Sequence, residues 1–318
     1  MPFLIERDNS MSRAFVFSGQ GSQDVGMGRD LADAYPESAA VFECADEILG
    51  YGLSGICFHG PAEQLTRTQH CQPGIFVMSV AAYEALRAKF PQPAFAAAAG
   101  LSLGEWTALH VAGALSFEDA LRALEARGRF MQEACDEEEG AMVGIIALEV
   151  EDLVPICEQT GAEFANINSP GQIVLSGARR AVEDAKRLAE EAGARKAMML
   201  NVAGAYHSRL MQGAAERMQE VLAGIDVTEP AVPVMSNATG AAHGDPDSIR
   251  RALVAQITGC VQWVRNIEAL AALGIEEYVE FGPGKVLTGL IKRIDRAGRL
   301  NNIHDHESLK KTIEAIQS

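Results

Sequence analysis

The feature of this sequence that most restricts its fold is the pattern Gly-x-Ser-x-Gly at residues 100–104. It is typical of a nucleophile elbow, a sharp turn between a strand and a helix that presents a serine hydroxyl on strained backbone. Both glycines are expected because a side chain at either position would collide with the neighbouring strand and helix. The next N–H is then free to help form an oxyanion hole. The five residues alone fit a plain glycine-flanked turn equally well.

The residues on either side of this pattern support the elbow only in part. The alanine-rich stretch 94–99 has helical propensity, yet small residues also suit a tightly packed central strand. Downstream, Leu103, Trp106 and Leu109 follow helical spacing. A helix after the turn is therefore supported, whereas the stretch before it could be a strand or a helix. Ser102 stands at the turn.

Composition excludes several classes of protein. A chain of 318 residues can form one large domain or two modest ones. Its net charge of -16 argues against a nucleic-acid binder or a polybasic membrane protein. Its six cysteines are scattered, which predicts reduced thiols in the cytoplasm, with neither a disulfide framework nor a zinc site. No cofactor is expected. Residues 1–10 are not expected to act as a signal peptide, and no apolar run approaches the ~20 residues of a membrane span.

Strands and helices alternate along the chain. A strand is predicted at 13–18 and helices at 28–49, 72–90 and after the capping box at Ser116. After the His207 segment, a helix is predicted to end at about residue 224. It is followed by a strand at 232–235, helices at 248–258 and 264–274, a strand at 277–281 and a helix at 285–296. This alternation predicts an α/β-hydrolase-like core with a mainly parallel sheet, formed by residues 1–134 and 203–318.

A different pattern occupies residues 135–202. Strands are predicted at 142–150, 162–168, 172–176 and 196–202, with helices at 152–159 and 179–192. The order βαββαβ is that of a ferredoxin-like unit, and its length suits an inserted subdomain.

Serine needs a base to become a nucleophile, and histidine is the usual one. Of the seven histidines, His207 is the best candidate because it follows a strand and a Gly-Ala turn. A histidine at a helix start with a satisfied hydrogen bond is the alternative. His243 lies in a predicted polar turn, and no aspartate stands out as a third member. The sequence therefore favours a Ser–His dyad.

Several separated motifs match one family. The chain resembles the malonyl-CoA:acyl carrier protein transacylases and the discrete acyltransferases of polyketide synthases, from about residue 14 to 296. The matching segments are FSGQGSQ at 17–23, QP at 72–73, GLSLGE at 100–105, RGRFMQ at 127–132, NINSPGQ at 166–172, GAYH at 204–207 and GPGKVL at 282–287.

The resemblance implies a role for each matching residue. Ser102 would be the nucleophile and His207 the general base and acid. The backbone N–H groups of Gln20 and Leu103 would form the oxyanion hole. A main-chain carbonyl near Gln256 would orient the histidine in place of an aspartate.

The resemblance also implies how the substrate is selected. Arg127 would pair with the malonyl carboxylate, and Gln72 and Tyr206 would line the substrate site. Tyr206 stands in a segment similar to the Ala-Phe-His form of malonyl-selective members, which favours malonyl over methylmalonyl. Two departures are Leu101, where many members carry histidine, and Trp106, where tyrosine or phenylalanine is more usual.

The implied function is malonyl transfer from malonyl-CoA to acyl carrier protein for fatty-acid synthesis, by a monomer without nucleic-acid or membrane partners. Alternatives are a trans-acting polyketide acyltransferase, an acyl-carrier hydrolase and a non-catalytic carrier-binding domain. Because carrier proteins are acidic, docking needs a local basic patch. The sequence offers two such patches, one around Arg179, Arg180 and Lys186 and one around Lys285 and Lys292. The first patch also carries acidic residues such as Glu183 and Glu190, so an ordinary solvated face is the alternative. We favour docking at a cleft between the subdomain and the core, with the first patch contributing the basic residues.

Overall fold

The computed structural model describes residues 12–90 and 94–317 and contains two sheets. The first is wholly parallel, with strand order β2-β1-β7-β8. Its strands are β1 (Arg13–Phe17), β2 (Ala97–Gly100), β7 (Glu277–Phe281) and β8 (Arg299–Ile303). In register, Phe17 lies opposite both Gly100 and Phe281, so β1 and β2 end side by side. Loops that follow these strands therefore meet at one edge of the sheet.

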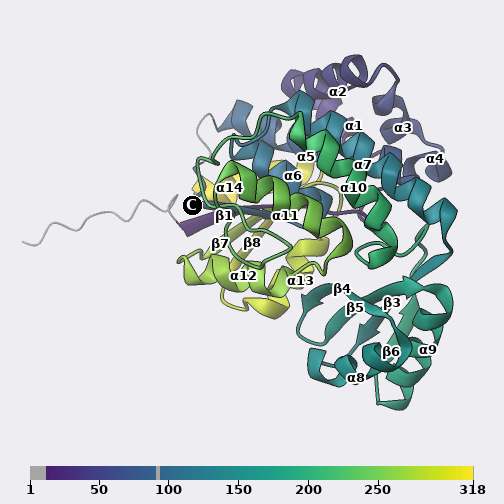
Figure 1. Ribbon diagram of the computed structural model, residues 1–318. Coiled ribbons are helices and arrows are strands. Elements are labelled where there is room, and N and C mark those ends of the chain that lie inside the picture. The colour runs from purple at the N-terminus through teal and green to yellow at the C-terminus, as the bar shows by residue number, and fades with distance from the viewer. Residues whose placement is uncertain (1–11, 91–93, 318) are drawn as a thin grey trace, which may run out of the picture.

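Both faces of this sheet are covered by helices (Figure 1). Successive side chains of β1 alternate between two hydrophobic clusters: Phe15 and Phe17 join one, Ala14 and Val16 the other. The larger cluster includes residues of α1 (Arg29–Ala34), α2 (Pro36–Leu49), α3 (Leu53–His59), α4 (Ala62–Thr66), α5 (Thr68–Lys89), α6 (Leu103–Val111), α7 (Phe117–Glu137), η2 (Arg209–Met211), α10 (Gln212–Ala223), α11 (Pro246–Thr258) and α14 (His306–Gln317). The smaller cluster includes residues of α12 (Trp263–Ala272) and α13 (Val286–Ile294).

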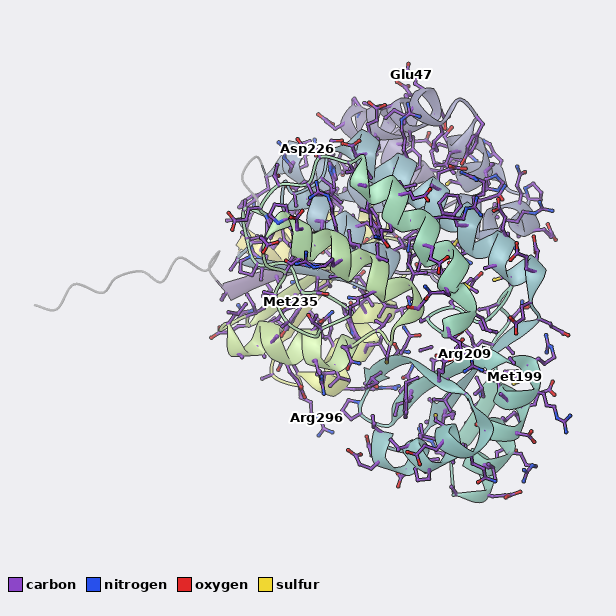
Figure 2. All side chains as sticks on the ribbon, in the orientation of Figure 1. Glu47, Met199, Arg209, Asp226, Met235 and Arg296 are labelled. Carbon is purple, nitrogen blue, oxygen red and sulfur yellow. The ribbon has the colours of Figure 1, made fainter. Side chains whose placement is uncertain are left out.

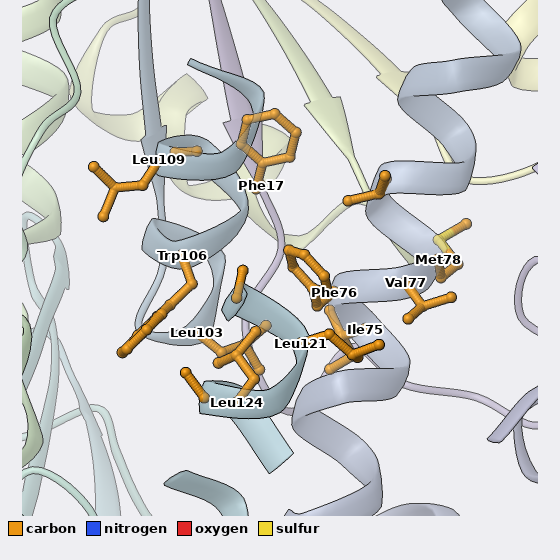
Figure 3. Packing of buried hydrophobic residues seen from close by; sticks show 14 of the residues in the cluster. Phe17, Ile75, Phe76, Val77, Met78, Leu103, Trp106, Leu109, Leu121 and Leu124 are labelled. Atoms are coloured by element: carbon orange, nitrogen blue, oxygen red, sulfur yellow. The ribbon is translucent and has the colours of Figure 1, made fainter. Parts of the chain in front are cut away.

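The centre of the larger cluster supports the turn that follows β2. Leu103 and Trp106 of α6 belong to this cluster together with Phe76 of α5 and Leu121 of α7 (Figure 3). Trp106 is fully buried. The first turn of α6 is therefore anchored by packing in the core.

The second sheet is antiparallel, with order β4-β5-β3-β6. Its strands are β3 (Gly140–Ile146), β4 (Glu163–Ser169), β5 (Gln172–Ala178) and β6 (Lys196–Met199), connected through α8 (Val150–Thr160) and α9 (Arg179–Glu191). This order is that of a ferredoxin-like unit, so the predicted fold class is confirmed. Backbone bonds between β4 and Val261 join the sheet to the core, and Arg209, labelled at the junction in Figure 2, pairs with Glu163 of β4.

Several sequence predictions differ from the structure. The helix predicted at 28–49 is divided at Tyr35, because Pro36 starts a new helix. The strand predicted at 232–235 forms only isolated bridges at Val234 and Met235, since Pro233 has no N–H for a ladder. The sequence predicts no strand or helix beyond residue 296, whereas the structure has β8 and α14 there.

The segment 1–10, for which the sequence predicts no signal peptide, lies outside the described residues. Among those described, no helix combines the length and apolarity needed to cross a membrane.

Candidate active site

The turn between β2 and α6 has the geometry of a nucleophile elbow. Ser102 has φ 52° and ψ -106°, a conformation that L residues rarely adopt. A Cβ on Gly100 would lie 1.9 Å from the carbonyl carbon of Gly104, and a Cβ on Gly104 would lie 2.2 Å from the carbonyl oxygen of Phe17. The two glycines therefore let the start of α6 pass directly against β1 and β2. This is the collision expected from the sequence.

His207 meets the serine from a loop far away in the sequence. Its Nε2 lies 2.9 Å from Ser102 Oγ, and its Nδ1 lies 2.8 Å from the main-chain carbonyl oxygen of Gln256. A carbonyl can only accept, so Nδ1 carries the proton and Nε2 is left to accept from the serine hydroxyl. His207 is itself strained, with φ 58°. The arrangement is a Ser–His pair oriented by a peptide carbonyl.

Burial keeps this imidazole neutral. The pKa of His207 falls to about 4, mainly because the ring is withdrawn from water and secondly because the Arg127 cation lies nearby. Hydrogen bonds to the backbone of Gln256 and Gly259 oppose the shift. At neutral pH the ring is therefore unprotonated and able to take a proton.

Arg127 is the buried cation of the site, with 1% of its surface exposed. Its Nη2 donates to Ser102 Oγ across 3.0 Å and to Gln256 Oε1 across 2.9 Å, while Nη1 donates to Gln72 Oε1 across 2.7 Å. Its Nε has no partner among the described residues. Burial lowers the pKa of Arg127 to about 10, so the group remains charged at neutral pH. Such a guanidinium, with donors to spare, suits a carboxylate ligand.

The sequence resemblance predicts that two backbone N–H groups, those of Gln20 and Leu103, form an oxyanion hole. Leu103 is the first residue of α6, where backbone N–H groups have no acceptor within the helix. Gln20 lies in the loop after β1, and Phe17 at the end of β1 is paired with Gly100. Across residues 12–90 and 94–317, neither N–H has a hydrogen-bond acceptor. Both are therefore free to bind an external oxygen.

Ser102 and His207 open into a cavity of about 790 Å³. Gln20, Gln72 and Tyr206 also line it, and the opposite wall comes from the antiparallel sheet through residues such as Met142 and Val174. Tyr206 is held by a 2.7 Å hydrogen bond between its hydroxyl and that of Thr68. The structure thus brings together all eight residues singled out from the sequence: Gln20, Gln72, Ser102, Leu103, Arg127, Tyr206, His207 and Gln256.

Three further residues at the site were not found by sequence reasoning. Glu105, Asn237 and His243 form a buried group behind the elbow, bonded to Gln256 and to the backbone of Ser102. His243, interpreted as part of a polar turn, has a side chain only 1% exposed. One signal was available for Glu105: it is the one acidic residue of α6, a helix that is mostly apolar.

Comparison with known proteins adds independent information. Residues 14–309 match the family model described as an acyl transferase domain. A malonyl CoA-acyl carrier protein transacylase of Bacillus subtilis (strain 168) is 40% identical over 309 residues, which cover 96% of this chain and 97% of that protein. The protein of the same description from Escherichia coli (strain K12) is 44% identical over 285 residues, covering 88% and 92%.

A solved structure shares the fold closely. It is the complex of a type II polyketide-synthase acyl-carrier protein with its malonyl-transacylase. The TM-score is 0.92 at 39% identity, and the match covers 96% of this chain and 99% of that chain.

Proposed function

Since this chain belongs to the acyl transferase domain family, we propose that it transfers the malonyl group from malonyl-CoA to the pantetheine thiol of an acyl carrier protein. The observation that carries this proposal is Arg127, a buried guanidinium 3.0 Å from the nucleophile oxygen. An acyl group without a charge would have no use for that cation, whereas malonyl carries a carboxylate.

The reaction proceeds in two half-reactions through a malonyl-serine ester. Ser102 Oγ attacks the thioester carbonyl of malonyl-CoA while His207 Nε2 takes the hydroxyl proton. The backbone N–H groups of Gln20 and Leu103 stabilise the oxyanion. When the C–S bond breaks, His207 returns the proton to the CoA sulfur. The carrier thiol then attacks the ester, loses its proton to His207, and Ser102 recovers its hydrogen.

We propose that Arg127 makes the site prefer malonyl over acetyl. Three amide or hydroxyl oxygens accept from its guanidinium, and Gln72, which lines the cavity, supplies one of them. We propose that the malonyl carboxylate displaces this neutral partner, because a charge-assisted bidentate pair is stronger than a bond to an amide. Tyr206 bounds the same part of the cavity and limits the size of the acyl group.

Three further proposals concern the domains, the oligomeric state and the location of the protein. We propose a catalytic core formed by residues 1–134 and 203–318, with residues 135–202 as a subdomain that supplies the second wall of the cavity. We propose a monomer, since all the residues of the site come from one chain. We also propose a cytoplasmic protein, because none of its six cysteines is in a disulfide.

The test is a transfer assay with the purified chain, labelled malonyl-CoA and two holo carrier proteins, one of fatty-acid and one of polyketide origin. Malonyl-carrier formation faster than malonate release supports the proposal. The better carrier identifies the pathway, an open point because a solved relative binds a polyketide-synthase carrier. Malonate release without transfer would instead indicate a hydrolase.

A further inference from the structure

Behind the elbow, three residues from two distant segments form one hydrogen-bonded cluster, which we call the elbow brace: Glu105, Asn237 and His243. Glu105 is fully buried in the first turn of α6. Its Oε1 lies 2.7 Å from His243 Nε2, and its Oε2 accepts from the Asn237 N–H across 2.9 Å. A buried carboxylate must be compensated, so these partners are required for a stable fold. The same contacts also fix the backbone of the elbow and the side chain of Gln256.

Asn237 fixes the backbone of the elbow itself. Its Oδ1 accepts from the N–H of Ser102 across 2.6 Å, and its Nδ2 donates to the carbonyl oxygen of Gly100 across 2.8 Å. One side chain therefore holds the peptide groups on both sides of Leu101. Ser102 has φ 52°, and such strain persists only where the surroundings enforce it.

Glu105 also determines the orientation of Gln256. A carboxylate only accepts, so the Gln256 amide must turn its Nε2 toward Glu105, at 2.7 Å. The amide oxygen then faces Arg127 Nη2, and the same Nε2 reaches the carbonyl oxygen of Ser102 at 3.0 Å. The main-chain carbonyl of Gln256 meanwhile holds His207. Glu105 is thus linked to the nucleophile and the cation through the Gln256 side chain, and to the base through the Gln256 backbone.

His243 holds the carboxylate in this position. It is presented by a tight turn in which its N–H donates to the carbonyl oxygen of Val234 and the N–H of Ser236 donates to that of Ala241. Among the described residues, it is the only partner of Glu105 Oε1. Without it, the carboxylate could rotate away from Asn237 and Gln256.

We propose that Glu105 and His243 are positioning residues for acylation of Ser102, acting through Asn237 and Gln256 without touching substrate. This inference rests on the proposed function, because it concerns the first half-reaction. It predicts that weakening the brace slows the chemical step at saturating malonyl-CoA while leaving the apparent affinity nearly unchanged. Small displacements of reacting groups are sufficient for such an effect.

The experiment measures single-turnover formation of malonyl-Ser102 as a function of malonyl-CoA concentration, together with Tm. His243→Leu keeps a similar volume but removes the donor, and His243→Gln keeps an N–H donor of similar reach. Glu277→Gln is the matched control. Glu277 is also a buried carboxylate, and it pairs with Arg13 at the start of β7 and β1, the edge of the parallel sheet that lies away from the elbow.

We expect His243→Leu to lower the saturating rate constant about tenfold or more, with the half-saturating concentration changed less than about threefold. His243→Gln should recover most of the rate. Glu277→Gln should lower Tm but keep the native rate constant. If His243→Leu does not fold, Glu105→Gln, with one acceptor oxygen in place of two, should show a smaller loss in the same direction.

Two results would overturn the inference, and they are distinguishable. A folded His243→Leu or Glu105→Gln protein that acylates at the native saturating rate would show that the brace serves stability alone. A native protein that forms no malonyl adduct would overturn the proposed function, and the brace with it.

Discussion

Arg127 Nη2 lies 3.0 Å from Ser102 Oγ, the same oxygen atom that lies 2.9 Å from His207 Nε2. The nucleophile thus contacts the base and the cation together. A cation at this distance favours the alkoxide form of the serine and lowers the pKa of the histidine. The Arg127 cation is also close enough to bind the free carboxylate of a malonyl group attached to Ser102.

Arg127→Ala should therefore change acyl selectivity more than overall chemistry. Malonyl transfer is expected to fall about 10- to 100-fold more than acetyl transfer, since a charge-assisted contact contributes roughly 1.5–3 kcal/mol. Arg127→Lys should be intermediate, because lysine cannot bind a carboxylate bidentately. The measurement is the ratio of kcat/KM for malonyl-CoA and acetyl-CoA. Arg129→Ala, two residues along on the exposed side of α7, is the control. Equal losses for both substrates would mean that Arg127 acts only structurally.

The acylation rate should be insensitive to pH well into the acid range. Below its pKa, protonated Nε2 cannot accept the serine proton, so the rate falls as pH drops through that value. The pKa of His207 is about 4, and kcat/KM for Ser102 acylation should therefore decline only near pH 4. Arg127→Ala removes a nearby cation, so the pKa of His207 and the pH at which the rate falls should both rise. Burial should still keep this pKa below the usual histidine value of ~6.5. A limb near pH 6.5 in the native protein would contradict the environment described for His207.

The elbow should not tolerate a single methyl group. In Gly104→Ala the new Cβ would meet the Phe17 carbonyl oxygen at 2.2 Å, and neither backbone can move freely. The free energy of unfolding should fall by about 1–3 kcal/mol, with loss of acylation as α6 shifts. Gly213→Ala is the control, since its Cβ would enter open space in α10. That variant should gain up to about 1 kcal/mol and remain active. Chemical denaturation with a parallel activity assay measures both.

Carrier docking is now expected at α13 in place of α9. Met142 and Val174 face the cavity, while their neighbours Val143 and Leu175 pack with α9, so α9 lies on the opposite face of the antiparallel sheet. Basic side chains of α9 such as Lys186 are also paired with acidic ones on the same helix. The start of α13, by contrast, lines the cavity.

Lys285→Glu with Lys292→Glu should raise KM for the acidic carrier several-fold at low ionic strength, because attraction between opposite charges is screened by salt. Self-malonylation from malonyl-CoA should be unchanged. Arg180→Glu with Lys186→Glu is the matched reversal on α9. If only the α9 pair raises KM, the original expectation from the sequence is correct and docking is on the subdomain helix.

Much of the fold could be predicted because the relevant signals are local. The glycines of the elbow, the capping serine before α7 and the βαββαβ order are patterns within short windows. Ser116 does accept from the N–H of Asp119. The break at Pro36 was also a local signal and was overlooked. The C-terminal strand β8 carries polar residues such as Asn301 and Asn302, which gave it the composition of a tail.

The brace could not be predicted, because its contacts join residues 132 and 138 positions apart. Asn237 and His243 lie in an irregular segment whose shape is set by isolated bridges, so neither residue has a periodic position. The sequence also gives no sign that Gln256 contributes its amide as well as its carbonyl. Pairings of this kind depend on tertiary structure alone.

The central claim, that Ser102 carries the malonyl group, is tested most directly by intact-mass spectrometry after brief mixing with malonyl-CoA. The native protein should gain the mass of one malonyl group, and Ser102→Ala should gain none. A malonyl adduct that persists in Ser102→Ala would contradict the account, because the acyl group would then reside on another residue.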